Sequence, residues 1–299
     1  MNVKYFRMLL LTTLLIFATA CDEETTGPID ADVSPPTDLR AASDNEAIIL
    51  DWKPSVSESQ DNFGGYRVTV RNPETNQSFF ENAPKGSGHR IENLSNGTRY
   101  EITVHAVTSQ DKASADAPMI EWAPAIRRDV NQLNQEIRVY ATTSTTFNSA
   151  VDLFNASGIC EVIPQVGDIF RDRGDLYVHA PNETSNFLVI KSPSTANNQG
   201  LETQFSTVFY NADDLDAQFA TTPPAIATYT TAEVTIPNSS VTTGKVVYGR
   251  LKRGTDHYYF RLLVKKGDNG KLVQGSGADR YLEFVVSYQH VRNIPFAKH

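Results

Sequence analysis

The sequence lacks the local motifs that usually indicate an enzyme or a nucleic-acid binder. Its six histidines form no H-x-x-x-H or H-E-x-x-H pair, so a catalytic zinc site has no local support. Neither a G-x-S-x-G nucleophile elbow nor a phosphate-binding loop is present. Lysine and arginine number 27 against 35 acidic residues, giving a net charge of -8. Because phosphate binding requires clustered cations, this balance argues against nucleic acid as a partner.

Cysteine and long apolar runs are also scarce. The two cysteines are Cys21 and Cys160, and the apolar run from Met8 to Ala18 is too short to cross a bilayer comfortably as a helix. A short basic segment with Lys4 and Arg7 precedes that run, and the small residues 18–20 (ATA) separate it from Cys21. This order of basic, apolar and small residues is typical of a secretory signal peptide.

The small residues followed directly by Cys21 resemble the lipobox of bacterial lipoproteins, although Ala18 replaces the usual leucine. The resemblance implies that signal peptidase II removes residues 1–20 and that the Cys21 thiol carries a diacylglycerol. The alternative is an ordinary secretory signal followed by a chance cysteine. Processing would bring the net charge to about -10. Cys160 would then have no disulfide partner, and we expect it to be a small buried hydrophobic residue rather than a nucleophile.

Residues 21–36 are predicted to be a disordered tether, because they are acidic, rich in Pro, Thr and Gly, and poor in large apolar side chains. The acidic residues 22–24 that follow the cysteine resemble the surface-export signal of Bacteroidota lipoproteins. That resemblance implies an outer-membrane protein, lipid-anchored and exposed at the cell surface. In enteric bacteria, an aspartate such as Asp22 would instead suggest retention at the inner membrane, so a periplasm-facing protein is the alternative.

Residues 33–123 are predicted to form a domain of short β-strands. Residues 47–52, 66–70 and 100–107 read as strands separated by turn signals, and the period of two in 66–70 places alternate side chains on one face. No helical period of comparable strength is present. The segment resembles a fibronectin type III domain, with Trp52 ending the second strand and residues 94–100 (LSNGTRY) paralleling the L-x-P-G-T-x-Y signature. This resemblance implies an immunoglobulin-like sandwich in which the Tyr100 hydroxyl anchors a corner.

Residues 124–299 resemble no family that we recognise, but their pattern is again that of strands. About eight alternating segments favour a larger β-sandwich or a jelly-roll-like domain, in which residues 258–265 pair with 281–288 and residues 267–270 lie in the connection. A short helix is predicted over residues 149–154. The expected strands cover residues 136–142, 175–179, 187–190, 204–210, 231–236, 245–249, 258–265 and 281–288.

Three groups of side chains in this second segment invite functional interpretations. The aromatic-rich group of Tyr248 and residues 257–260 suits stacking on sugar rings, although core packing is the favoured interpretation because alternation sends side chains to both faces. The acidic groups are Asp168, Asp172 and Asp175, and Asp213, Asp214 and Asp216. They offer oxygen ligands for Ca²⁺ but lack EF-hand spacing. We expect solvated charges there, and we predict no metal and no cofactor.

The sequence therefore predicts a lipid-anchored envelope protein that binds or displays a glycan or protein partner and has no catalytic activity. A second hypothesis is a polysaccharide hydrolase with an accessory fibronectin module, which would require two carboxylates roughly 5–9.5 Å apart. Candidates for that pair are Asp168, Asp175, Glu202 and Glu283, and nothing in the sequence selects two of them. A third hypothesis is a structural subunit of an envelope complex, which an exposed apolar patch would favour.

Overall fold

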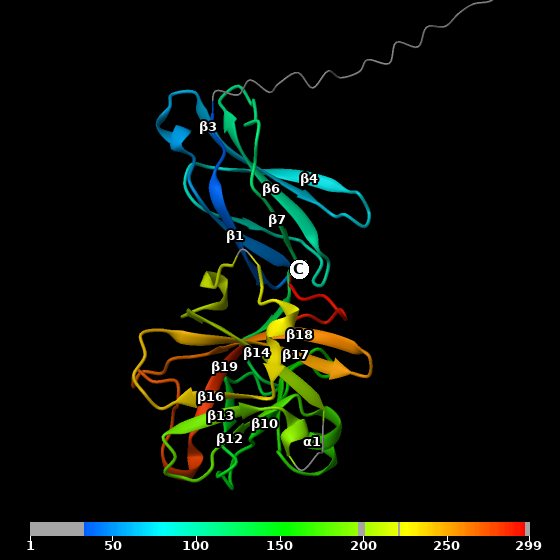
Figure 1. Ribbon diagram of the computed structural model, residues 1–299, viewed down its shortest axis with the longest axis vertical. Coiled ribbons are helices and arrows are strands. Elements are labelled where there is room, and N and C mark those ends of the chain that lie inside the picture. The colour runs from blue at the N-terminus through cyan, green and yellow to red at the C-terminus, as the bar shows by residue number, and fades with distance from the viewer. Residues whose placement is uncertain (1–32, 197–200, 221, 297–299) are drawn as a thin grey trace, which may run out of the picture.

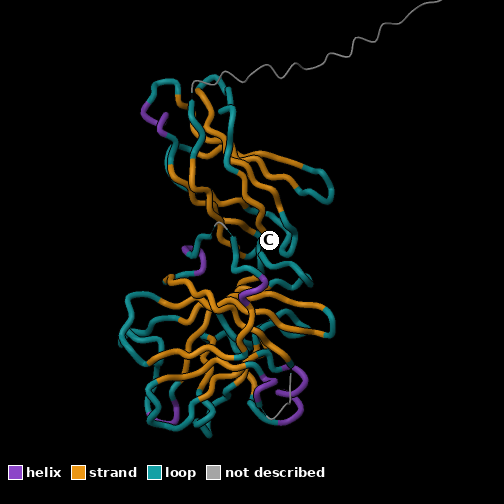
Figure 2. Tube along the Cα trace, viewed as in Figure 1, coloured by secondary structure: helices purple, strands orange, loops and turns teal. Residues whose placement is uncertain are grey.

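The structure, a computed structural model, describes residues 33–196, 201–220 and 222–296. Nearly all regular structure in these ranges is β-strand, and their single α-helix is the seven-residue α1 (Gly167–Arg173). The strands form two sandwiches, which follow one another along the long axis of the molecule (Figure 1). Figure 2 shows that the helical segments are short and lie between strands. The predicted all-β fold class is confirmed.

The N-terminal sandwich contains two antiparallel sheets. One has the strand order β1-β2-β5 and the other has the order β4-β3-β6-β7. This division into three and four strands is that of an immunoglobulin-like sandwich. The strands are β1 (Thr37–Asp44), β2 (Ala47–Lys53), β3 (Phe63–Arg71), β4 (Ser78–Ala83), β5 (His89–Ile91), β6 (Tyr100–Thr108) and β7 (Met119–Trp122).

The core of this sandwich follows the predicted alternation. Tyr66, Val68 and Val70 of β3 all point inward and are fully buried. Trp52 packs edge-on against Tyr66 at a ring-centroid distance of 5.2 Å. The Tyr66 hydroxyl donates a hydrogen bond of 2.6 Å to Glu58, so the aromatic core residue keeps its polar atom satisfied.

The predicted corner is also present. Leu94 is buried, and the Tyr100 hydroxyl accepts a hydrogen bond of 3.1 Å from the Ser95 main-chain N–H. Gly97 adopts a φ of +79°, and a Cβ atom on it would lie 2.3 Å from Cγ2 of Val291 in the second sandwich. Glycine is therefore required at this turn by both its backbone conformation and its close approach to a neighbouring segment.

The C-terminal sandwich also has two antiparallel sheets. The five-stranded sheet has the order β11-β10-β12-β13-β16, and the seven-stranded sheet has the order β15-β14-β17-β18-β19-β8 with β9 also paired to β19. The predicted pairing of residues 258–265 with 281–288 is the pairing of β18 with β19. The strands are β8 (Ile126–Arg128), β9 (Ile137–Tyr140), β10 (Ala150–Asp152), β11 (Glu161–Ile163), β12 (Leu176–His179), β13 (Phe187–Lys191), β14 (Glu202–Ala212), β15 (Tyr229–Thr231), β16 (Glu233–Pro237), β17 (Gly244–Arg253), β18 (Asp256–Val264) and β19 (Tyr281–Tyr288). The 3-10 helices in the described loops are η1 (Val56–Ser59), η2 (Pro193–Thr195), η3 (Leu215–Ala217), η4 (Ile226–Thr228) and η5 (Gly277–Asp279).

Both faces of the seven-stranded sheet are covered. Phe260 and Leu262 point into the core shared with the five-stranded sheet. Tyr259 and Leu263 point the other way, into a second apolar cluster that includes Phe296 near the C-terminus. A strand that is buried on both faces has apolar residues at consecutive positions rather than at alternate ones, which explains the dense aromatic group in β18.

The helix predicted over residues 149–154 is wrong. Residues 150–152 form β10, which pairs with β11 and β12. Val151 belongs to the main core, whereas Ala150 packs with Phe170 in a small cluster on the other face of the sheet. Short apolar runs suit either element, and the neighbouring strands decide the outcome here.

The two sandwiches are joined by a buried connection. Residues 123–125 are buried, and their main-chain groups are hydrogen-bonded to both sandwiches. The Ala123 N–H donates to the Phe296 oxygen at 2.7 Å, and the Ala125 N–H donates to the Asp44 oxygen at 3.1 Å. This connection is held at both ends and does not behave as a free linker.

Candidate functional site

The candidate site is a groove on the C-terminal sandwich, built first by the loop of residues 130–136 between β8 and β9. The Asn131 side-chain oxygen accepts hydrogen bonds from the N–H groups of Leu133 at 2.9 Å and Gln135 at 3.1 Å. Asn134 takes the left-handed conformation with φ of 58°, which asparagine tolerates. The loop is thus held by its own amides, and it leaves the Leu133 side chain 68% exposed.

One amide of this loop closes the free edge of β11. The Gln132 side chain accepts a hydrogen bond from the Val162 N–H at 2.9 Å and donates one to the Val162 oxygen at 3.2 Å. Asn148 donates a further hydrogen bond to the same oxygen at 3.2 Å. An edge strand exposes unpaired main-chain groups, and here side-chain amides satisfy them. The loop is consequently fastened across the groove to the five-stranded sheet.

The opposite wall is aromatic. Ile137 and Val139 of β9 are buried, so Arg138 and Tyr140 point outward. The Tyr140 ring stacks on Phe147 at a centroid distance of 4.2 Å and an interplanar angle of 17°. Phe147 is 46% exposed. Burial raises the pKa of Tyr140, and the neighbouring phenol of Tyr281 adds to this, so the Tyr140 hydroxyl stays neutral at physiological pH.

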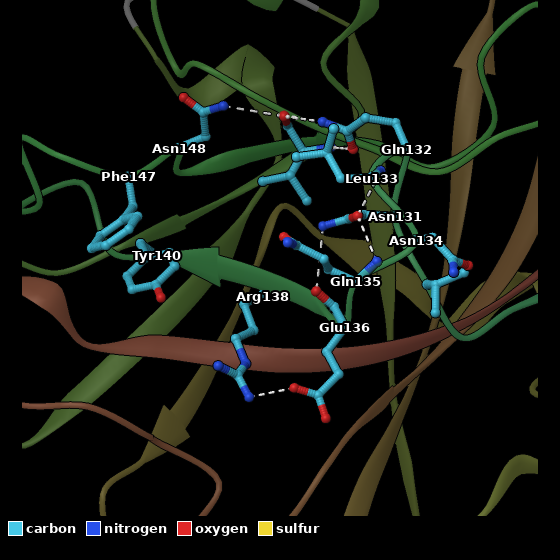
Figure 3. Close-up of a pocket in the computed structure, with 12 residues that line it drawn as sticks. Asn131, Gln132, Leu133, Asn134, Gln135, Glu136, Arg138, Tyr140, Phe147 and Asn148 are labelled. Atoms are coloured by element: carbon cyan, nitrogen blue, oxygen red, sulfur yellow. Dashed lines mark hydrogen bonds and ion pairs between the residues drawn. The ribbon is translucent and has the colours of Figure 1, made fainter.

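Figure 3 shows how these parts surround the cavity, with the amides of the loop on one side and the rings of Tyr140 and Phe147 on the other. The cavity measures about 660 Å³ and is open to solvent. We refer to it as the amide-aromatic groove. Its lining residues are Val130, Asn131, Gln132, Leu133, Asn134, Gln135, Glu136, Arg138, Tyr140, Phe147, Asn148 and Val162.

A smaller charged cavity of about 230 Å³ continues the groove and shares Glu136 and Arg138 with it. Arg138 pairs with Glu136 and, at 3.3 Å, with Glu283, which also pairs with Lys265. The charges alternate in sign and compensate one another. Exposed ion pairs of this kind contribute little stability but offer both donors and acceptors to a ligand.

The chemistry of the groove suits a neutral, hydroxyl-rich ligand with an apolar face. Amide side chains both donate and accept hydrogen bonds, and exposed aromatic rings present flat apolar surface at low conformational cost. The sequence interpretation did not single out this region. The only sequence signal is the run of amides in residues 131–135 (NQLNQ), followed by alternation in β9.

The aromatic group at Tyr248 and residues 257–260 is mainly packing, as the favoured interpretation predicted. Tyr248, Tyr259 and Phe260 are buried, at 1%, 4% and 0% exposure. They therefore offer no stacking surface to a ligand. His257 and Tyr258 are partly exposed, and Tyr258 lines a separate cavity.

The first acidic group is only partly as predicted. Asp168 and Asp172 lie on α1, where Arg171 pairs with both at 2.8 Å and 3.1 Å. Asp175 is instead 2% exposed and pairs with Arg253. The prediction of a solvated charge is therefore wrong for Asp175, because the start of β12 carries it under the neighbouring sheet.

The second acidic group is exposed and largely neutralised. Asp214 and Asp216 pair with Arg127 at 2.9 Å and 2.5 Å, and Asp213 lies 4.0 Å from Lys266. Over the described part of the chain, no three His, Cys, Asp or Glu side chains come together in an arrangement that could hold a metal ion.

Each of the carboxylates considered for a hydrolase is paired with a cation. Asp168 pairs with Arg171, Glu202 with Lys252, and Glu283 with Lys265. Asp175 and Glu283 line two different cavities. Cys160 is buried as expected, and burial raises the pKa of its thiol, which keeps it protonated and unreactive.

The comparisons with known proteins bear on the N-terminal sandwich. The family model of the fibronectin type III domain matches residues 34–120. This segment is a fibronectin type III domain. Asn96 stands where the signature commonly has proline, and its side chain accepts a hydrogen bond of 2.9 Å from the Glu46 N–H. The resemblance read from residues 94–100 is thereby confirmed.

Solved structures of fibronectin type III domains are similar to this chain at low identity. The FN5 domain of Drosophila Lar is 23% identical, over 31% of this chain and 97% of that one, with a TM-score of 0.25. A two-domain segment of chicken tenascin is 12% identical, over 77% and 98%, with a TM-score of 0.28. The FN1–FN3 domains of chicken CNTN1 are 13% identical, over 78% and 68%, with a TM-score of 0.30. No curated protein matches the chain.

The predicted lipidation site lies outside the described residues. Cys21, the signal peptide and residues 21–32 of the tether belong to that part of the chain. Among the described helices, none is long and apolar enough to cross a membrane.

Proposed function

We propose that the protein is a lipid-anchored protein of the bacterial envelope that binds glycan in the amide-aromatic groove, without catalysing a reaction on it. The stacked pair of Tyr140 and Phe147 beside the amide-rich loop carries this proposal. A sugar ring has an apolar face that suits an aromatic surface, and its hydroxyls suit the amides of the facing wall. The open shape of the groove favours an extended chain over a small enclosed ligand.

The N-terminal features support presentation at a membrane surface. The lipobox-like residues 18–21 provide an attachment point at Cys21, and the acidic tether would repel an anionic membrane. The fibronectin domain serves as a spacer in this proposal. The described chain enters it at the end that lies away from the C-terminal sandwich, as Figure 1 shows, so the spacer separates the groove from the anchor.

The binding part of the proposal is tested with the mature full-length chain on a glycan array, followed by calorimetric titration of the best polysaccharide. We expect Phe147→Ala and Tyr140→Ala each to weaken binding about tenfold, because loss of one aromatic contact costs roughly 1 kcal/mol. Phe80→Ala is the matched control, since Phe80 is also an exposed aromatic, at 57%, but lies in β4 of the other sandwich. Binding that is absent, or equally weakened by all three changes, would overturn the proposal.

The anchoring part is tested in cells. We expect an intact mass that corresponds to residues 21–299 plus acyl chains, and a Cys21→Ala variant that is no longer attached to membranes. External protease should digest the native protein if it faces outward. An unlipidated mass would contradict the proposed lipid anchor. Full protection from protease would indicate that the protein faces the periplasm.

A further inference from the structure

A second cavity of the C-terminal sandwich is smaller than the groove and is lined by other side chains. It measures about 360 Å³, and none of its lining residues lines the groove. Asp175 and Arg253 form its polar part, and Phe154, Tyr258 and Tyr288 form its apolar part. His290 also lines it. The ligands that fit such a cavity follow from its charge, its exposed rings and its free polar atoms.

The charges in the cavity cancel. The Asp175 carboxylate is 98% buried, accepts a hydrogen bond of 2.8 Å from the Leu153 N–H, and pairs with Arg253. The Arg253 side chain keeps 30% of its surface exposed, so guanidinium donors remain available. The neighbouring Asp152 is itself paired with Arg173 at 3.0 Å. A balanced site of this kind selects against both anionic and cationic ligands, because either would leave a buried charge uncompensated.

The apolar wall is a set of nearly parallel rings. Phe154 and Tyr288 stack at a centroid distance of 5.0 Å and an angle of 12°. Tyr258 lies parallel to Tyr288 within 6°, at 6.4 Å. Stacked rings cover one another's faces, and Tyr288 is only 6% exposed, so the ring surface left to the cavity belongs to the partly exposed Phe154 and Tyr258. An exposed ring face fits the face of a planar or chair-shaped ring.

Several polar groups in the cavity have no partner within the described chain. The hydroxyls of Tyr258 and Tyr288 and the His290 ring make no hydrogen bond with any other described residue. Together with the carboxylate-guanidinium pair, they form a mixed set of donors and acceptors around the aromatic wall. A hydroxyl both donates and accepts, so a polyol can satisfy such a set.

We propose that this cavity binds the terminal pyranose unit of a neutral glycan. Its volume lies near the lower end of small-molecule sites, about 300–1,000 Å³, which suits a chain end rather than the middle of a polymer. The Arg253 guanidinium, held in place by the buried Asp175, donates to ring hydroxyls, while the aromatic wall covers the apolar face. The inference shares the ligand class of the proposed function, but its site is separate.

The test uses the mature full-length chain carrying 3-fluorotyrosine, observed by fluorine NMR. The signals of Tyr258 and Tyr288 are assigned through Tyr258→Phe and Tyr288→Phe. Methyl β-D-glucopyranoside, methyl β-D-galactopyranoside and methyl α-D-mannopyranoside are each titrated to about 100 mM, where weak single-sugar sites saturate. We expect at least one of them to shift both signals saturably and to leave the Tyr140 and Tyr281 signals in place.

Variants decide whether the response belongs to the cavity. Tyr258→Ala should weaken the Tyr288 response about tenfold, and Arg253→Met should do the same through loss of a donor. Phe147→Ala in the groove is the matched control and should leave it unchanged. The absence of a response to all three glycosides would overturn the inference. A response to N-acetyl-phenylalaninamide, but to none of the glycosides, would overturn it as well. If the cavity inference fails but Phe147→Ala abolishes polysaccharide binding, the proposed binding in the groove is still supported. The two proposals can therefore fail separately.

Discussion

Arg261, in β18 of the C-terminal sandwich, donates a hydrogen bond to the main-chain oxygen of Ser43, in β1 of the fibronectin domain. The guanidinium is fully buried and also donates to Gln218 Oε1 at 3.0 Å and to the Leu215 oxygen at 3.3 Å. Within the described chain it has no carboxylate in ion-pair contact, and burial lowers the pKa of Arg261. A cation held by carbonyl oxygens from both sandwiches fixes their relative orientation.

Replacement of Arg261 should loosen this joint. Arg261→Met leaves the Ser43 and Leu215 oxygens without a donor, and we expect a loss of about 1–3 kcal/mol in the free energy of unfolding. The scattering profile in solution should broaden as the sandwiches move independently. Arg250→Met is the control, because Arg250 lies in the adjacent β17 and bonds only to Gln204 within its own sandwich. Equal effects of the two changes would contradict a special role for Arg261.

Gly97→Ala should disturb the same joint from the other side. The added Cβ atom meets Val291, and the φ of +79° is unfavourable for alanine. We expect a destabilisation of about 1–3 kcal/mol from the left-handed backbone and the contact together. In a Val291→Ala background the contact is relieved, and only the part of the destabilisation that comes from the backbone conformation should remain. A double-mutant cycle by urea denaturation measures the difference, and purely additive effects would mean that the two segments do not touch.

The hydrogen bond at the tyrosine corner can be tested by removing a single oxygen atom from Tyr100. Tyr100→Phe removes the acceptor of the Ser95 N–H and should cost about 1 kcal/mol. Tyr281→Phe is the control, since Tyr281 lines the smaller charged cavity of the other sandwich and anchors no corner. Thermal unfolding of the two variants should therefore differ, and an unchanged midpoint for Tyr100→Phe would show that water replaces the lost acceptor.

The titration of Asp175 should make the stability of the protein depend on pH. Burial raises the pKa of Asp175 from its usual value of 3.8 to about 7, against the opposing effect of Arg253. The folded protein therefore holds this proton more tightly than the unfolded chain does. The contribution of Asp175 to stability is greatest below pH 4 and falls as the pH rises towards 7.

Asp175→Asn removes this titration. The free energy of unfolding should then decline less between pH 4 and pH 7 than it does in the unaltered protein, as measured by urea denaturation at several pH values. Asp172→Asn, on the exposed surface of α1, is the control and should leave the slope unchanged. Identical slopes for the three proteins would mean that Arg253 holds Asp175 ionised throughout.

Local patterns anticipated most of the strands but not the sites. Period-two alternation located β3 and β6, and the spacing of Leu94 and Tyr100 identified the corner. The pattern around residues 149–154 failed because a three-residue strand carries too little periodicity to distinguish it from a helix. The seven-residue α1 went unpredicted for the same reason. Neither the groove nor the second cavity was anticipated, because each combines side chains from several separate strands and loops.

The amino-acid sequence by itself determined most of the longer strands and the fibronectin corner, because each depends on residues close together in the chain, and it predicts the export and lipid-attachment signals. Only the tertiary structure decided that Asp175 is buried, that Tyr140 meets Phe147 in an open groove, and that Arg261 reaches Ser43, 218 positions away. The physical reason is that alternation specifies which face a side chain occupies, whereas the pairing and stacking of distant strands specify what covers that face.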